Sequence, residues 1–328
     1  MAKNKAKKVE KVEKVNGDDS GVSPPFCAVA FFKTKLEENK DKISTGSAVI
    51  KTLKHVLDNS DASTIAGLLD ELKTEVNKLC GTDYSTASIR SASELFIRSI
   101  SLVSSETMNQ DDFKLLLNTF RHRAKLFSDR VELSRSLIGK YAAPYIVDDM
   151  KILTHSFSKV VFEALETAAK QGKEFKVFVT ESMPDASGKY MLEKLRQIGI
   201  PCTLILDSAV GYLMESVDII LLGAEGVMET GGIINKIGSL GIAICAKAYN
   251  KPVCIMAESI KFVKEYPLNQ SDIPNEFKYN TSTLKAKNLN TEHPLVDYTP
   301  PGYIYLLFTD LGILTPANVG EELIKLYT

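Results

Sequence analysis

The sequence lacks the features that would direct a chain to a membrane or out of the cell. No apolar run approaches the ~20 residues that a membrane-spanning helix needs, and residues 1–20 lack the apolar core of a signal peptide. The five cysteines are scattered, with no C-x-x-C pair and an odd count. We therefore expect free thiols in a reducing compartment, with neither a disulfide framework nor a zinc site. The formal net charge of −1 gives no electrostatic reason to expect nucleic acid or membrane as a partner. These absences predict a cytoplasmic protein.

Two nucleotide-binding motifs are also absent. The chain contains neither G-x-G-x-x-G nor G-x-x-x-x-G-K-[ST], the glycine-rich loops that hold the phosphates of dinucleotides and of nucleoside triphosphates. A pattern of alternating strands and helices is therefore not by itself evidence for a nucleotide here. We expect no cofactor.

Composition divides the 328 residues into three parts. Residues 1–22 are rich in Lys, Glu and Asp and have no aromatic side chain, which is typical of a disordered tail. Because lysines and glutamates are interleaved there, a solvated tail is favoured over a nucleic-acid-binding arm. Residues 23–147 have apolar residues at helical spacing and almost no strand-like alternation, which predicts an all-helical domain. Ser63 is the expected N-cap of the helix that ends before Gly81.

Residues 148–328 alternate between short apolar runs and helical segments. Strands are expected at 151–154, 175–180, 202–206, 218–222 and 253–257, and helices at 158–170, 188–198, 209–215 and 239–250. This alternation predicts a Rossmann-like α/β domain, with a mostly parallel open sheet and helices on both faces. The polar, proline-containing stretch 269–301 is expected to be a long loop, followed by a strand at 304–308 and a helix at 319–327.

Polar residues follow three of the expected strands, in the segments 154–156, 180–185 and 223–236. In an open α/β sheet, ligands bind at the carboxyl ends of the strands, so these segments predict one shared pocket. Asn235 and Lys236 are the strongest binding candidates, since Gly231 and Gly232 are expected to let the backbone approach a ligand. A carboxylate, an amide and an ammonium together suit a phosphorylated polyhydroxy compound. The candidate ligand-binding residues at these strand ends are Thr180, Glu181, Glu225, Asn235 and Lys236.

Each of these candidates also has a plainer interpretation. Glu225 is equally suited to act as a general base, to pair with Lys236 or to cap a turn, and Lys236 to be a surface lysine. His155 and Ser156 are adjacent on an expected strand end and therefore point to opposite faces, which argues against a hydrolase pair; His155 is expected to cap the next helix. Arg90 and Ser91 precede an apolar helix and suit a phosphate, with ordinary helix capping as the alternative.

Many short motifs together resemble one family. The matching segments are ILTH (152–155), FVTES (178–182), LDSAVGY (206–212), GAEG (223–226), GGIINKIG (231–238), AKA (246–248), AES (257–259), PLNQ (267–270), FTDLG (308–312) and ELIKLY (322–327). They are similar to the alpha regulatory subunits of eukaryotic translation initiation factor 2B, over about residues 25–328.

This resemblance implies a function. It predicts a homodimer at the centre of a complex with the beta, gamma, delta and epsilon subunits of factor 2B, which exchanges GDP for GTP on initiation factor 2. The alpha subunit does not catalyse the exchange; it helps to sense the phosphorylated alpha subunit of factor 2 and to inhibit exchange. The helix around Thr64 is the expected contact with that phosphoprotein.

The wider superfamily contains methylthioribose-1-phosphate and ribose-1,5-bisphosphate isomerases. These enzymes have a Cys after Thr-His and an Asp after Gly-Ala, where this chain has Ser156 and Glu225. A serine hydroxyl is far too weak an acid to replace the thiol, and the longer Glu225 displaces its carboxylate. We therefore expect no catalytic residues, and a pocket that still binds a sugar phosphate as a regulatory ligand. The alternative is a sugar-phosphate isomerase or a metabolic sensor.

Overall fold

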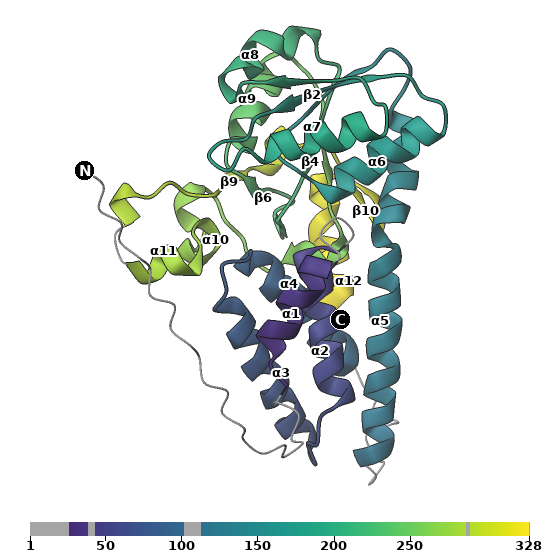
Figure 1. Cartoon of the computed structure of the whole chain (residues 1–328), viewed down its shortest axis with the longest axis vertical. Helices are drawn as coiled ribbons and strands as arrows, with labels where there is room; N and C mark the ends of the chain where they lie inside the picture. Colours follow the sequence, from purple (N-terminus) through teal and green to yellow (C-terminus); the bar gives the residue numbers. More distant parts are fainter. Residues whose placement is uncertain (1–25, 39–42, 102–112, 287–288, 328) are drawn as a thin grey trace, which may run out of the picture.

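The chain forms a helical region that lies against one edge of an α/β region (Figure 1). The computed structural model describes residues 26–38, 43–101, 113–286 and 289–327, so the predicted tail, residues 1–22, lies outside the described residues. The helical region contains α1 to α5, which span Ala28–Glu38, Thr45–Asp58, Ile65–Cys80, Thr86–Ser101 and Phe113–Ala142.

These helices bury one apolar face each, and α2 and α3 begin at the hydroxyl caps Ser44 and Thr64. Leu53, Leu72 and Phe96, from α2, α3 and α4, are fully buried in one shared core. The cap of α3 is Thr64, whose hydroxyl accepts a hydrogen bond from Gly67 N at 3.1 Å. The expectation of Ser63 was wrong by one residue, because the cap is the extended residue immediately before the first helical turn.

The α/β region is built on a seven-stranded sheet in the order β11-β10-β7-β4-β1-β2-β3. All its strands run parallel except β11, which pairs antiparallel with β10. The strands β1, β2, β3, β4, β7, β10 and β11 span Lys151–Thr154, Lys176–Thr180, Cys202–Ile205, Ile219–Gly223, Val253–Met256, Leu306–Thr309 and Gly312–Leu314. The helices α6, α7, α8, α9 and α12 span Lys159–Lys170, Ser187–Gln197, Val210–Leu213, Ser239–Ala248 and Val319–Tyr327.

Both faces of this sheet are buried, as continuous apolar strands predict. Ile152 belongs to the core with residues of α6 and α7, and its neighbour Leu153 belongs to the opposite core with residues of α8, α9 and α12. The predicted fold class, a helical part followed by a mostly parallel sheet with helices on both faces, is confirmed.

A second sheet in the order β8-β5-β6-β9 was not predicted. Its strands β5, β6, β8 and β9 span Gly226–Met228, Ile233–Lys236, Phe262–Val263 and Val296–Thr299. The expected long loop 269–301 was therefore wrong: it contains β9, and the short helices α10 and α11 span Asn275–Lys278 and Thr281–Ala286. Gly231 and Gly232 both have a place in this second sheet. Gly231 (φ 81°) forms the turn between β5 and β6, and a Cβ on Gly232 would come within 2.6 Å of the Tyr298 ring.

Short 3-10 turns complete the described residues. They span Ala143–Tyr145, Asp207–Ala209, Met214–Ser216, Ser259–Lys261 (η4), Gln270–Asp272, Leu289–Thr291, Pro301–Tyr303 and Pro316–Asn318. Of these, η4 follows β7 and reaches the helical region, because Ile260 is buried in the core of α2 to α5.

The two regions are joined by buried contacts. The buried Ser91 hydroxyl of α4 lies 2.6 Å from the Ile260 carbonyl and 2.7 Å from the Phe262 carbonyl. The 30-residue α5 is roughly 45 Å long and runs beside the helical region up to α6 (Figure 1). These contacts place the N-terminal ends of α2 and α4 and the last third of α5 beside the carboxyl ends of the parallel strands.

Candidate functional site

A cavity of about 220 Å³ lies where the helical region faces the carboxyl ends of β1 and β4. This volume is below the roughly 300–1,000 Å³ of drug-sized sites, so the cavity suits a small ligand. Its lining comes from both regions: Ser44, Thr45, Ser85, Ser88, Arg135, His155, Ser156, Phe157, Ser158, Lys159, Val160, Gly223, Ala224, Glu225, Asn235, Lys236, Glu258 and Lys261.

The cavity has an excess of positive charge. Among its lining residues are four cations, Arg135, Lys159, Lys236 and Lys261, and two carboxylates, which leaves a formal excess of two positive charges. Helix N-termini add to this field, since Ser44 is the N-cap of α2 and Ser158 the N-cap of α6. An anionic ligand is therefore favoured.

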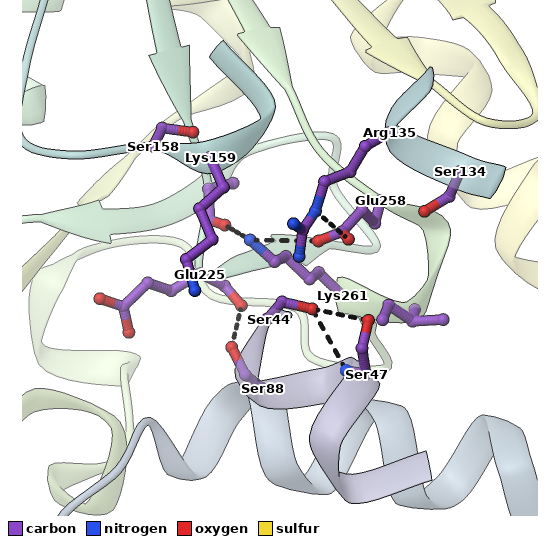
Figure 2. A network of polar contacts seen from close by, with 12 residues as sticks. Ser44, Ser47, Ser88, Ser134, Arg135, Ser158, Lys159, Glu225, Glu258 and Lys261 are labelled. Atoms are coloured by element: carbon purple, nitrogen blue, oxygen red, sulfur yellow. Dashed lines mark hydrogen bonds and ion pairs between the residues drawn. The ribbon is translucent and has the colours of Figure 1, made fainter. Parts of the chain in front are cut away.

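An ion-pair group from both regions forms one wall (Figure 2). Arg135 Nε of α5 lies 3.0 Å from Glu258 Oε1, and Lys261 Nζ lies 3.8 Å from Glu258 Oε2. Lys261 Nζ also donates to the Ala224 carbonyl at 2.7 Å. Glu258 is 1% exposed, and its Oε2 has no hydrogen-bond partner among the described residues. A buried acceptor without a donor costs about 1–3 kcal/mol of stability. This oxygen is therefore unfavourable as it stands and would gain from a hydrogen-bond donor.

Lysine and serine side chains complete the lining. Lys159 Nζ donates to the Ile43 carbonyl at 2.5 Å, just before the N-terminus of α2. Ser85 Oγ donates to Glu225 Oε2 at 2.7 Å, and Ser88 Oγ donates to the Glu225 carbonyl at 3.1 Å. Figure 2 shows the Glu225 carboxylate pointing away from Lys159 and Lys261. Glu225 thus ties α4 to the end of β4.

His155 joins three elements at the strand ends. Its Nε2 lies 2.8 Å from the Ile237 carbonyl, which only accepts, so Nε2 carries the proton and Nδ1 accepts from Thr180 Oγ1 at 2.6 Å. Burial lowers the pKa of His155 below its usual value, which agrees with a neutral ring. The expectation that His155 caps the next helix was wrong, since Ser158 is that cap.

Ser156 is held in the left-handed backbone region. Its φ is 63°, its Oγ lies 2.8 Å from Ser187 Oγ, and its amide donates to Ser182 Oγ at 2.6 Å. Ser182 has a similar φ of 60°. Such conformations cost of order 1–3 kcal/mol each and gather at functional sites. The ends of β1 and β2 therefore have the backbone strain that is typical of a ligand site.

Asn235 and Lys236 lie on β6 and both line the cavity. Asn235 Nδ2 donates to Ser239 Oγ at 2.9 Å, and Lys236 Nζ pairs with Asp185 Oδ2 at 2.6 Å. Across the strand pair, Asp297 of β9 accepts from Gly238 N at 2.8 Å and Leu240 N at 3.1 Å, which fixes the start of α9. Burial raises the pKa of Asp297 to about 6, against an ordinary 3.8.

Other predicted residues lie outside the cavity lining. Thr180 is buried behind His155, and Glu181 pairs with Lys189 at 3.6 Å. Arg90 pairs with Glu276 and borders a separate cavity of about 560 Å³ between α3 and α4. Ser91 points to the backbone of η4 and β8. The structure thus does not bring Arg90 and Ser91 to the shared pocket, because the side chains of successive helical residues point in directions about 100° apart. Thr64 is exposed, at the far end of α3.

Sequence reasoning missed several lining residues, mainly Ser44, Arg135, Lys159, Glu258 and Lys261. One signal was available for Glu258, which follows the end of β7 just as Glu225 follows β4. Arg135 lies in the interior of a long helix, where nothing in the local sequence marks it. Among the described residues, no group of His, Cys, Asp and Glu is arranged to hold a metal, and no helix is long and apolar enough to cross a membrane.

The fold and the pocket define a known class of protein. The model of the Initiation factor 2 subunit family matches residues 38–316, so the chain belongs to this family. Within it, the chain is similar to the translation initiation factor eIF2B subunit alpha of Caenorhabditis elegans, with 51% identity over 299 residues, 91% of this chain and 98% of the relative.

Two further comparisons give a more distant relative and a solved structure. A ribose 1,5-bisphosphate isomerase of Pyrococcus furiosus is 32% identical over 293 residues, 87% of this chain and 89% of the enzyme. A chain of the tetrameric eIF2B-beta2-delta2 complex from C. thermophilum has the same fold, with a TM-score of 0.72 and 19% identity over 92% of this chain and 96% of that one.

Proposed function

We propose that this chain is a regulatory alpha-type subunit of the translation initiation factor 2B complex. The observation that carries the proposal is the 51% identity to the eIF2B subunit alpha of C. elegans, which extends over 98% of that protein. In this role the chain acts in the cytoplasm and assembles with the beta, gamma, delta and epsilon subunits. It does not exchange nucleotide itself, and it helps phosphorylated initiation factor 2 to inhibit the exchange.

The composition of the purified complex tests this proposal. The tagged chain is purified gently from its own cells and the accompanying proteins are quantified by mass spectrometry. We expect four other subunits and initiation factor 2 in near-equal amounts. Recovery of the chain alone, as a homo-oligomer, would refute the proposal.

The pocket chemistry supports a non-catalytic subunit. Where the isomerases have Cys and Asp, the chain has Ser156, engaged with Ser187, and Glu225, engaged with Ser85. An unactivated hydroxyl does not move a proton efficiently at neutral pH. The second candidate function, a sugar-phosphate isomerase, is favoured by the 32% identity to the P. furiosus enzyme. Incubation with ribose 1,5-bisphosphate and NMR detection of a ketose would establish that alternative, and we expect none.

We also propose that the pocket binds a sugar phosphate as a regulatory ligand. The excess of cations, the two helix N-termini and the serine hydroxyls support an anionic, hydroxylated occupant. Ribose 5-phosphate at 100 times its Kd should add about 2.7 kcal/mol to the free energy of unfolding, which a thermal shift detects. The variant Lys236→Met should lose this shift and the surface control Lys170→Met should keep it; no shift in the parent protein would refute the ligand.

The same subunit role predicts a homodimer. Apolar side chains around α8 and α9 are exposed, including Leu206 at 59%, Tyr212 at 88% and Ile244 at 48%. Such a patch on a stable fold supports an interface with a second copy. Light scattering tests this prediction. We expect the parent protein to be a dimer and Tyr212→Glu to be a monomer. A monomeric parent would refute the homodimer.

A further inference from the structure

Glu258 differs from the other charged residues that line the cavity, because one of its oxygens has no hydrogen-bond donor. Oε1 is engaged by Arg135 Nε at 3.0 Å, whereas Oε2 has no hydrogen-bond partner among the described residues. Lys261 Nζ lies 3.8 Å from Oε2 and donates instead to the Ala224 carbonyl. Buried polar atoms normally have a hydrogen-bond partner, so an orphan acceptor in a cavity wall points to a missing donor.

A ligand that supplies this donor has a particular chemistry. A carboxylate between two cations only accepts hydrogen bonds, and it repels the phosphate that the rest of the cavity favours. A ligand therefore meets Glu258 best with a neutral hydroxyl, while its phosphate lies near the cations. Oε2 is buried in the structure, so this contact requires the Lys261 side chain to rotate toward the phosphate and open Oε2 to the cavity.

We propose that Glu258 is the specificity-determining residue of the pocket, which accepts a hydrogen bond from a sugar hydroxyl and selects sugar phosphates over other phosphate anions. This inference rests on the proposed binding of a sugar phosphate. It goes further, because it assigns the sugar part of the ligand to the wall made by Arg135, Glu258 and Lys261.

The geometry makes the substitution Glu258→Gln informative. Arg135 donates to Oε1, so the amide oxygen of a glutamine is held on that side and its NH2 group takes the place of Oε2. A donor then faces the ligand hydroxyl in place of an acceptor, while one negative charge is lost beside the phosphate. The loss of the hydrogen bond from the hydroxyl should lower the affinity for a sugar phosphate, whereas the loss of the negative charge should raise the affinity for any phosphate.

Binding of two phosphates to the full-length protein tests the proposal. Ribose 5-phosphate carries hydroxyls, and methyl phosphate carries the same anion without them; both are measured by isothermal titration calorimetry. The parent protein should prefer ribose 5-phosphate by at least tenfold. Glu258→Gln should weaken the binding of ribose 5-phosphate by tenfold or more, about 1.4 kcal/mol. The same variant should bind methyl phosphate as tightly as the parent protein or more tightly.

The possible failures are distinguishable. If the parent protein binds neither phosphate, the ligand site itself is refuted and this inference with it. If the parent binds both equally, or if Glu258→Gln weakens both by the same factor, the anion site stands and the role of Glu258 is refuted. A parent protein without a preference would refute the role of Glu258 even if Glu258→Gln does not fold.

Discussion

Asp297 gives a quantitative prediction about stability and pH. The side chain is 9% exposed, and burial raises its pKa to about 6, from 3.8. The native state thus holds the proton more tightly than the unfolded state, and stability falls as the pH rises from about 4 to about 6. The full shift corresponds to about 3 kcal/mol. Between pH 5.0 and pH 7.5 the parent protein should lose about 1–2 kcal/mol through this group.

The variant Asp297→Asn isolates this effect. An amide oxygen in the place of Oδ2 still accepts from the amides of Gly238 and Leu240, but the side chain no longer ionises. His155, whose lowered pKa acts in the opposite direction, is present in both proteins, so its contribution cancels in the difference. We therefore expect Asp297→Asn to gain about 1–2 kcal/mol relative to the parent between pH 5.0 and pH 7.5.

Urea unfolding followed by circular dichroism at the two pH values measures the difference. The denaturant midpoint of the parent should fall relative to that of Asp297→Asn as the pH rises, with equal m-values. Parallel behaviour of the two proteins across this range would refute the assignment of a raised pKa to Asp297.

Three further predictions concern the α7 start, the wall of the pocket and the partner surface. Gly188→Ala places a Cβ 1.7 Å from the Thr180 carbonyl oxygen, so it should cost at least about 3 kcal/mol in urea unfolding. Arg135→Met leaves the buried Glu258 charge without its nearest partner and should cost about 3–5 kcal/mol by the same measurement. Thr64→Lys should reduce the inhibition of nucleotide exchange by phosphorylated factor 2 in the reconstituted complex, and removal of the cap should also cost about 1 kcal/mol of stability.

Each of these has a matched control. Gly241 of α9 is exposed with no atom within 4 Å of an added Cβ, so Gly241→Ala should be neutral or stabilise by up to about 1 kcal/mol. The double variant Arg135→Met/Glu258→Met should recover most of the loss, and a purely additive result would contradict the ion-pair explanation. Thr64→Ser keeps the capping hydroxyl and should behave as the parent; undiminished inhibition in Thr64→Lys would remove Thr64 from the partner surface.

The parallel sheet was predictable, and the second sheet was not. Strands such as Ile219–Gly223 are continuous apolar runs with both faces buried, and such runs are a strong local signal. By contrast, β8 has two residues, and β6 ends in Asn235 and Lys236. Pairing with distant segments stabilises these short strands, and local preference does not report it.

The pocket residues also fall into those that the sequence predicted and those that it did not. Glu225, Asn235 and Lys236 follow from the rule that ligands bind at strand ends, and the structure places all three in the cavity lining. Arg135 enters through the packing of α5 against the sheet. Arg90 was expected near the ligand, but it points to Glu276 on the other side of α4, because a sequence does not report which face of a helix meets a distant segment.

The bonds from Ser91 to the carbonyls of Ile260 and Phe262 have a consequence during synthesis. Donor and acceptor are 169 residues apart for the first of these bonds, and ribosomes add about 5–20 residues per second. On a nascent chain, α4 therefore exists for roughly 8–34 s before its partner in η4 is synthesised. Throughout that time the Ser91 hydroxyl is hydrated, so the docking of α4 against the α/β region is completed only late in synthesis.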